Sequence, residues 1–267
     1  MSTITISPLT ARIGAEIDGV DLRAPLSDPQ IHEIHHALIE HQVIFFRDQP
    51  IDIATQVAFG RRFGTLHLHT GVPGLSEEFP EVTRIHADAD STGINGEEWH
   101  SDLSCDVVPP MGSILHIHTL PPAGGDTIFA SMYAAYEALS PNMRHYLEGL
   151  TATHDGVLAF GKYGRDKKYP VSSHPVIKTH PVSGRKVIYV NRGFTSHINE
   201  LPRDESSAVL SYLFAHATKP EFQVRFRWRK HSIAFWDNRC TQHIAIWDYF
   251  PHVRSGYRVQ IDTEGLN

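Results

Sequence analysis

The sequence predicts an α+β fold that is mainly β, a β-sandwich or jelly roll that carries helices on its outside. Many short runs of β-branched and aromatic residues recur along the chain, which is typical of strands. Glycines and prolines, 19 and 17 in number, separate these runs as turns do. Helical spacing of apolar residues is confined to segments grouped in two places. Such a fold packs sheets together and leaves helices to cover the outer faces.

Helices are predicted where apolar residues recur every three or four positions behind a capping residue. Ser27 or Asp28 is expected to cap the first helix, with Pro29 in its first turn. Ser140 is expected to cap a later one. The predicted helices are a segment from 27 to 39, then 51–63 ending at Gly64, 132–139, 141–150, and 203–216 with Val209, Leu210, Tyr212 and Leu213 inward.

Strands are predicted where short apolar runs lie between turn signals. The dipeptide Ser183-Gly184 is expected to join two such runs into a hairpin. In chain order, the expected strands are two within 3–22, one each at 43–47, 113–118 and 127–130, the hairpin at 180–190, and one each at 222–228, 232–236 and 257–261.

Composition indicates one globular domain over residues 1–267. A hydrophobic content of 41% with 20% charged residues is ordinary for such a protein. The net charge of −6 and the lack of any lysine or arginine run argue against nucleic-acid binding. Two cysteines are too few for a disulfide framework and suit a reducing cytoplasm. With no export-type leader and no apolar run of membrane-spanning length, we expect a cytoplasmic protein without membrane contact.

An imidazole and a carboxylate stand two positions apart at His100 and Asp102. On an extended segment such residues point to the same side. A distant histidine, His243, can complete a three-ligand face, and two imidazoles with one carboxylate form the triad of non-heme Fe(II) oxygenases. The chain has 19 histidines, so a His-x-Asp pair also arises by chance and needs support from its context.

Residues 65–98 lie directly before this pattern and are rich in glycine, proline and aspartate, with few periodic features. A loop this long inside a compact domain is usually functional or disordered. Because it runs straight into Trp99 and His100, we expect it to form a lid over the active site.

Five segments of the chain resemble the taurine dioxygenase family of Fe(II)/2-oxoglutarate enzymes. They are Glu98–Asp102, Gly124–Thr127, Thr179–Gly184, Trp236–His243 and Arg254. The resemblance runs from about Ile4 to Ile261, and the spacings of 11 residues from His243 to Arg254 and 27 from His100 to Thr127 match the family. It implies a double-stranded β-helix (jelly roll) core with flanking helices. It also implies Fe(II) held by His100, Asp102 and His243, with 2-oxoglutarate as cosubstrate and O2 as oxidant.

The far carboxylate of 2-oxoglutarate needs a cation, and an arginine offers two donors in a matching fork. Arg254 takes that role, with the Thr127 hydroxyl as helper. Arg258 lies four positions further on, so on one strand both guanidinium groups project to the same face. Two buried cations require two anions. We infer that the second anion is the substrate, since an arginine at this position holds the sulfonate of taurine in the family.

The substrate pocket resembles the family only in part. His69 matches the histidine that reaches the sulfonate, and Phe160 and Phe194 match aromatic walls. Val72 and Gly96 stand where taurine enzymes have a tyrosine and an asparagine. Neither replacement can donate a side-chain hydrogen bond, so we expect a roomier and more apolar pocket.

The predicted reaction is iron-centred hydroxylation, with no separate protein acid or base. Its expected substrate is a small anionic organosulfonate or alkyl sulfate, which would break down with release of sulfite or sulfate. An aryloxyalkanoate or another carboxylate is the alternative within the family. A zinc hydrolase and a non-catalytic jelly-roll protein are the alternatives outside it. We also expect a homo-oligomer, either a dimer or a tetramer.

Residues beside the proposed ligands receive supporting roles. Trp99 and Trp236 are expected to pack next to the ligands and exclude water. Asp237, Asn238 and Arg239 are expected to hold the loop that orients a metal-bound imidazole.

Overall fold

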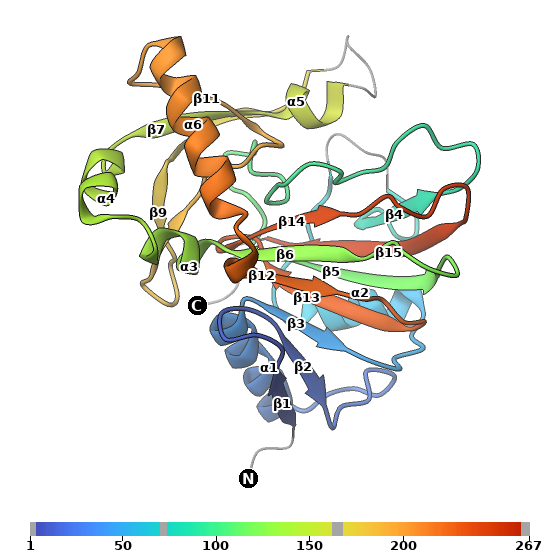
Figure 1. Cartoon of the computed structure of the whole chain (residues 1–267). Coiled ribbons are helices and arrows are strands. Elements are labelled where there is room, and N and C mark those ends of the chain that lie inside the picture. The colour runs from blue at the N-terminus through green and yellow to red at the C-terminus, as the bar shows by residue number, and fades with distance from the viewer. Residues whose placement is uncertain (1–3, 70–73, 162–167, 263–267) are drawn as a thin grey trace.

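The computed structural model describes residues 4–69, 74–161 and 168–262. Within these ranges the chain forms a mixed fold of helices and four sheets in which strands predominate (Figure 1). The mainly β character predicted from the sequence is therefore confirmed.

A seven-stranded sheet forms the largest layer. Its neighbouring strands pair antiparallel, except for one parallel pair near the N-terminus. In spatial order, the strands are β1 (Thr5–Pro8), β2 (Ala15–Asp18), β3 (Val43–Phe46), β13 (Ser232–Asp237), β5 (Gly112–Thr119), β15 (Arg254–Ile261) and β4 (Val82–Ala87).

A three-stranded sheet faces this layer. Its strands, in spatial order, are β12 (Gln223–Phe226), β6 (Thr127–Ser131) and β14 (Thr241–Ala245). Phe45 of β3 stacks on Phe226 of β12 with ring centroids 3.9 Å apart. Phe129 of β6 and Trp236 of β13 belong to the same buried cluster. The two sheets are thus joined by an aromatic core.

Two helices cover the outer face of the large sheet (Figure 1). They are α1 (Asp28–His41) and α2 (Ile53–Arg61). Leu38 of α1 and Phe59 of α2 share a buried cluster with Phe235 of β13. Ser27 caps α1 in a capping box with Gln30, which satisfies backbone donors at the start of the helix.

The rest of the chain builds a second body beside the sheets. It contains α3 (Met132–Glu137), α4 (Pro141–Leu147), α5 (Gly156–Phe160), α6 (Arg203–Ala217), the 3-10 helix η2 (Pro220–Phe222), the three-stranded sheet β11 (Thr195–Ile198), β7 (Thr151–Asp155), β8 (Val171–Pro175), and the pair β10 (Lys186–Ile188) and β9 (Ile177–Thr179). Leu213 of α6 and Val187 of β10 are fully buried in its core.

The structure corrects two expectations. Residues 65–98 are not one continuous loop, because β4 lies within them and pairs along β15. This edge strand has exposed and partly buried positions and no continuous apolar run, so it gave little signal. Tyr212 is 45% exposed and does not face inward. It stacks on His216 of the same helix.

Besides β4, the strands β7, β8, β11 and β14 were not predicted, and β9 lies just before the predicted hairpin at 180–190. The sequences of β7, β8, β11 and β14 are dominated by threonine, serine and histidine, and their stability comes from pairing with neighbouring strands. Among the described residues, no helix is long and apolar enough to cross a bilayer.

Candidate active site

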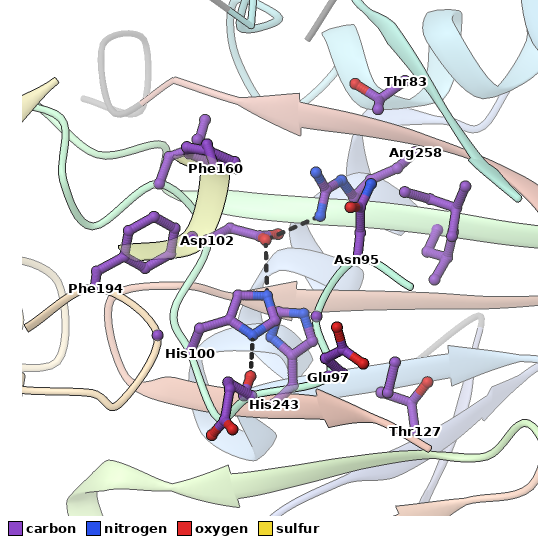
Figure 2. Close-up of a pocket in the computed structure, with 18 of the residues that line it drawn as sticks. Thr83, Asn95, Glu97, His100, Asp102, Thr127, Phe160, Phe194, His243 and Arg258 are labelled. Carbon is purple, nitrogen blue, oxygen red and sulfur yellow. Dashed lines mark hydrogen bonds and ion pairs between the residues drawn. The ribbon is translucent and has the colours of Figure 1, made fainter. Parts of the chain in front are cut away.

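A cavity of about 270 Å³ opens between the two facing sheets and α5. Its wall contains nearly every residue that the sequence singled out for a site, several of which Figure 2 labels. The predicted residues that line it are His69, Gly96, His100, Asp102, Thr127, Phe160, Phe194, His243, Arg254 and Arg258. Val72, also predicted, lies outside the described residues.

Backbone pairing brings the two histidines of the triad together. The His100 N–H donates to the His243 carbonyl at 3.1 Å, and the His243 N–H donates back to the His100 carbonyl at 2.8 Å. Their ring centroids are 4.1 Å apart. A short segment is thereby joined to β14, and residues remote in sequence form one cluster.

The donor atoms of this cluster suit a divalent transition metal. One nitrogen from each of His100 and His243 and one oxygen of Asp102 lie within 4.8 Å of one another. The His100 Nδ1 donates to the Glu98 carbonyl at 2.7 Å, so Nε2 is the ring nitrogen that faces the candidate metal position, and it lies 3.5 Å from Asp102 Oδ1. Burial lowers the pKa of His243 well below its usual range and keeps it neutral. Two neutral imidazoles and a carboxylate are the ligand set of a facial triad.

Asp102 is held on both sides. Its Oδ2 accepts a hydrogen bond from Ser113 Oγ at 2.7 Å, and Ser113 Oγ accepts one from Asn238 Nδ2 at 2.9 Å. Its Oδ1 accepts one from Arg258 Nη1 at 2.9 Å (Figure 2). Burial alone raises the pKa of Asp102, but Arg258 and the two imidazoles outweigh burial and leave that pKa well below the usual value. The carboxylate is therefore ionised and fixed in orientation.

Arg254 is a buried cation beside the cluster. It is 4% exposed, its Nε donates to the Gly125 carbonyl at 3.0 Å, and its Nη2 lies 3.5 Å from Thr127 Oγ1. No described carboxylate forms an ion pair with it, and burial lowers its pKa. Gly125 has a φ of +74°, and a Cβ there would lie 3.0 Å from Arg254 Cδ, so glycine lets the side chain pass. A buried guanidinium of this kind is suited to an anionic ligand.

Aromatic rings form another wall of the cavity. The Phe160 and Phe194 centroids are 5.5 Å apart, and His69 packs edge-on to Phe160 at 5.5 Å. Burial, followed by the charge of Arg258, lowers the pKa of His69 to about 4, so it is a neutral imidazole at physiological pH. This wall can enclose an apolar body next to the charge of Arg258.

Gly96 has a role that the sequence did not reveal. Its φ is +82°, and a Cβ would lie 2.9 Å from His100 Cε1. Glycine is therefore needed for the backbone conformation and for close approach to the imidazole. Its neighbours Asn95 and Glu97 also line the cavity, which is thus more polar at this point than expected. The two polar residues that flank the glycine in the sequence could have indicated this polar part of the cavity.

The residues around the ligands pack largely as expected. Trp236 lies 4.8 Å from the His243 ring, centroid to centroid, and Trp99 packs on the neighbouring core. The Arg239 guanidinium donates two hydrogen bonds to the Asp237 carboxylate, from Nε at 2.9 Å and from Nη2 at 2.6 Å. These contacts rigidify the turn before β14.

A second group of possible metal ligands, His180, Asp237 and Cys240, lies in the same buried region. The His180 Nε2 is 3.0 Å from Asp237 Oδ2, and its Nδ1 accepts from the Ser183 N–H at 3.0 Å. With the hydrogen bonds from Arg239 to Asp237, these contacts give both ring nitrogens of His180 and both carboxylate oxygens of Asp237 a hydrogen-bond partner. The group therefore forms a structural network.

Comparison with known proteins places the chain in a family. Residues 5–260 match the family described as "Taurine catabolism dioxygenase TauD, TfdA family". The chain belongs to this family, and it is an α-ketoglutarate-dependent dioxygenase. The family uses Fe(II) and 2-oxoglutarate, which agrees with the candidate metal centre.

The similar proteins differ in their named substrates. The chain is 33% identical to a putative α-ketoglutarate-dependent sulfonate dioxygenase of Schizosaccharomyces pombe, over 97% of this chain and 69% of that one. It is 32% identical to a sulfate ester dioxygenase of Pseudomonas putida, over 98% and 90%. It is also 32% identical to a 2,4-dichlorophenoxyacetate dioxygenase of Cupriavidus pinatubonensis, over 90% and 91%.

A solved structure shares the whole fold. It is described as a putative α-ketoglutarate-dependent taurine dioxygenase from Burkholderia xenovorans, and it superposes with a TM-score of 0.87 at 40% identity. The match covers 97% of this chain and 92% of the other. The arrangement of sheets and helices is therefore that of the family.

The role of Gly96 can be tested against a matched glycine. Gly149 also has a φ of +82°, but no atom lies within 4 Å of the position that a methyl group would take there. We expect Gly149→Ala to lower the free energy of unfolding by about 1–2 kcal/mol through backbone strain alone. Gly96→Ala should lower the free energy of unfolding further than Gly149→Ala does, because the added methyl group displaces His100. It should also weaken Mn(II) binding. Urea unfolding and anaerobic calorimetry measure the two effects, and equal behaviour of the variants would contradict the assigned contact.

The Ser113 hydroxyl provides a second test. Ser113→Ala removes the donor to Asp102 Oδ2 and should weaken Mn(II) binding about tenfold or more, as loss of a group that orients a ligand usually does. The control is Ser196→Ala, since Ser196 hydrogen-bonds to the Thr153 carbonyl away from the cavity. An unchanged Mn(II) dissociation constant in Ser113→Ala would show that this hydroxyl does not position Asp102.

Proposed function

We propose that this dioxygenase hydroxylates a small anionic organosulfonate or alkyl sulfate, with release of sulfite or sulfate. The observation that carries the proposal is the position of Arg258. Its guanidinium lies on the cavity wall beside the candidate metal centre, while Arg254 provides a second, more buried cation in the wall of the same cavity. In the described structure Arg258 pairs with Asp102, but bound Fe(II) would draw on the same carboxylate, so a cavity holding the metal and 2-oxoglutarate can accept a further anion on Arg258.

In this proposal His100, Asp102 and His243 hold Fe(II). The neutral state of His243 and the ionised state of Asp102 favour metal binding, because protons do not have to be displaced from these two ligands. The Glu98 carbonyl and the Ser113 hydroxyl orient two of these three ligands.

Arg254 and Thr127 bind the far carboxylate of 2-oxoglutarate. The Trp228 Nε1 donates to Thr127 Oγ1 at 3.0 Å, which holds the hydroxyl beside the guanidinium. Bound Fe(II) and 2-oxoglutarate would supply the oxidising chemistry, in which O2 is consumed and 2-oxoglutarate becomes succinate and CO2. The protein positions the two anions and excludes water from the cavity.

Arg258 binds the anionic group of the substrate. A guanidinium has five N–H donors. Within the described chain Arg258 uses one donor, on Asp102, and its buried Nε has no hydrogen-bond partner. His69, Phe160, Phe194 and Gly96, with Val72 as an untested member, surround the substrate body. This wall holds a C–H bond near the metal while Arg258 fixes the charged end.

An aryloxyalkanoate is the second candidate substrate. The aromatic wall of Phe160 and Phe194 supports it, as does the relative named for 2,4-dichlorophenoxyacetate. Arg258 would then bind a carboxylate in place of a sulfonate. The zinc hydrolase and the non-catalytic protein considered from the sequence do not agree with family membership.

Several expectations about the whole protein remain part of this proposal. We propose that the facing sheets form a double-stranded β-helix within one domain, 1–267. Cavity-lining residues from 65–98, among them His69 and Gly96, support a lid role for that segment. A dimer or tetramer and a cytoplasmic location stay predictions.

Substrate choice can be measured directly. We expect 2-oxoglutarate-dependent O2 uptake with hexanesulfonate and hexyl sulfate and none with hexanol, because the alcohol offers no anion to Arg258. Arg258→Gln should raise the KM for hexanesulfonate about 30-fold or more, the effect of removing one partner of a buried charge pair. Uptake with phenoxyacetate alone would favour the second candidate, and uptake with hexanol alone would contradict the role of Arg258.

Asp102 is the anionic ligand of the proposed metal site. Asp102→Ala removes the anionic ligand and leaves two neutral imidazoles, so we expect no measurable succinate formation. The exposed Asp90→Ala variant should retain the wild-type rate. Near-normal succinate production by Asp102→Ala would contradict the proposed metal site.

A further inference from the structure

Arg258 and the candidate metal share one oxygen atom. Asp102 Oδ1 accepts the Arg258 hydrogen bond at 2.9 Å, and the same oxygen lies 3.5 Å from His100 Nε2, the nitrogen left free for a metal. Asp102 Oδ2 is already bound by Ser113. The oxygen that points toward the metal position is therefore the one that Arg258 engages.

Both partners of this ion pair are shielded from water. The side chains of Arg258 and Asp102 are 13% and 4% exposed. Screening by solvent is weak for such a pair, so the energy of each charge depends strongly on its neighbours. A third charge placed next to either partner must change the interaction.

We propose that Arg258 couples substrate binding to metal binding, because Asp102 in the metal-free protein and the anionic group of the substrate compete for the same guanidinium. The inference rests on the proposed function for Arg258 as the residue that binds the substrate anion. It adds that this residue also influences the affinity of His100, Asp102 and His243 for the metal.

The sign of the coupling follows from the charges. A cation next to Asp102 opposes the approach of a divalent cation and occupies the oxygen that it needs. A substrate anion on Arg258 neutralises that cation and gives it another partner, so the metal binds more tightly. By thermodynamic linkage, the metal then raises the affinity for the anion by the same factor.

A purely structural ion pair would have the opposite effect on metal affinity. If Arg258 were needed to hold the Asp102 carboxylate in place, its removal would weaken metal binding. Ser113 and Asn238 already orient the carboxylate from its other side through Oδ2. The orientation of Asp102 therefore does not depend on Arg258 alone. The structural role predicts weaker metal binding on loss of Arg258, and the proposed coupling predicts tighter metal binding.

The test measures Mn(II) affinity without O2 and without 2-oxoglutarate, by anaerobic calorimetry at about pH 8, where carboxylates are ionised. The variants are Arg258→Met and Arg258→Gln, the second of which serves if the first does not fold. Arg84→Met is the matched control. Arg84 lies on β4 opposite Tyr257 of β15 and contacts His86, and it does not line the cavity.

We expect the Arg258 variants to bind Mn(II) about fivefold more tightly or better, the lower end of ordinary coupling between two sites. Arg84→Met should bind like the wild type. Hexanesulfonate should tighten Mn(II) binding in the wild type and have no effect in the Arg258 variants. Unchanged or weaker Mn(II) binding in both Arg258 variants, or no effect of hexanesulfonate on the wild type, would overturn the coupling.

This result is separate from the proposed function. An enzyme that turns over hexanesulfonate but shows no change in Mn(II) affinity upon loss of Arg258 retains its function and refutes the coupling. An enzyme with tighter Mn(II) binding in the variants but no turnover of any sulfonate or sulfate refutes the substrate assignment alone.

Discussion

The pair of backbone hydrogen bonds between His100 and His243 is the constraint on which the site depends. It joins the segment that follows residues 65–98 to β14 of the smaller sheet. The two imidazoles then lie 4.1 Å apart, centroid to centroid, with the carboxylate of Asp102 next to them. Ser113 on β5 donates to the Asp102 carboxylate, and Asn238 after β13 donates to Ser113. The larger sheet therefore orients Asp102, while the smaller sheet provides His243.

The second constraint on the cavity is that the buried charges of its two arginines must be balanced. Arg254 and Arg258 both come from β15, and each is largely shielded from solvent. Arg258 has Asp102 as a partner, whereas Arg254 has only neutral oxygen acceptors among the described residues. The buried cation without a carboxylate is the stronger attraction for an anion, which agrees with its assignment to the cosubstrate. In the proposed coupling, the substrate anion competes with Asp102 for the paired cation, Arg258.

Much of the site could be predicted from the sequence, because its chemistry depends on residue types at fixed spacing. His100, Asp102 and His243 were recognisable in this way, and Arg254 followed from its distance to His243. The strand β14, which carries His243, was missed because its sequence is polar and its pairing with β6 is a long-range contact. The packing of Gly96 against His100 could not be predicted, since a positive φ and the approach of the imidazole are visible only in three dimensions. The contacts of Asp102 with Ser113 and Arg258 likewise join residues remote in sequence.

In the proposed function, one cavity holds a divalent metal on His100, Asp102 and His243 and the cosubstrate on Arg254. A crystal structure with Mn(II) and N-oxalylglycine, an unreactive analogue of 2-oxoglutarate, tests it most directly. We expect anomalous density for Mn(II) between His100, Asp102 and His243, with the far carboxylate of the analogue on Arg254 and Thr127. Mn(II) bound at another site, or the analogue's far carboxylate on Arg258 with Arg254 unliganded, would contradict it.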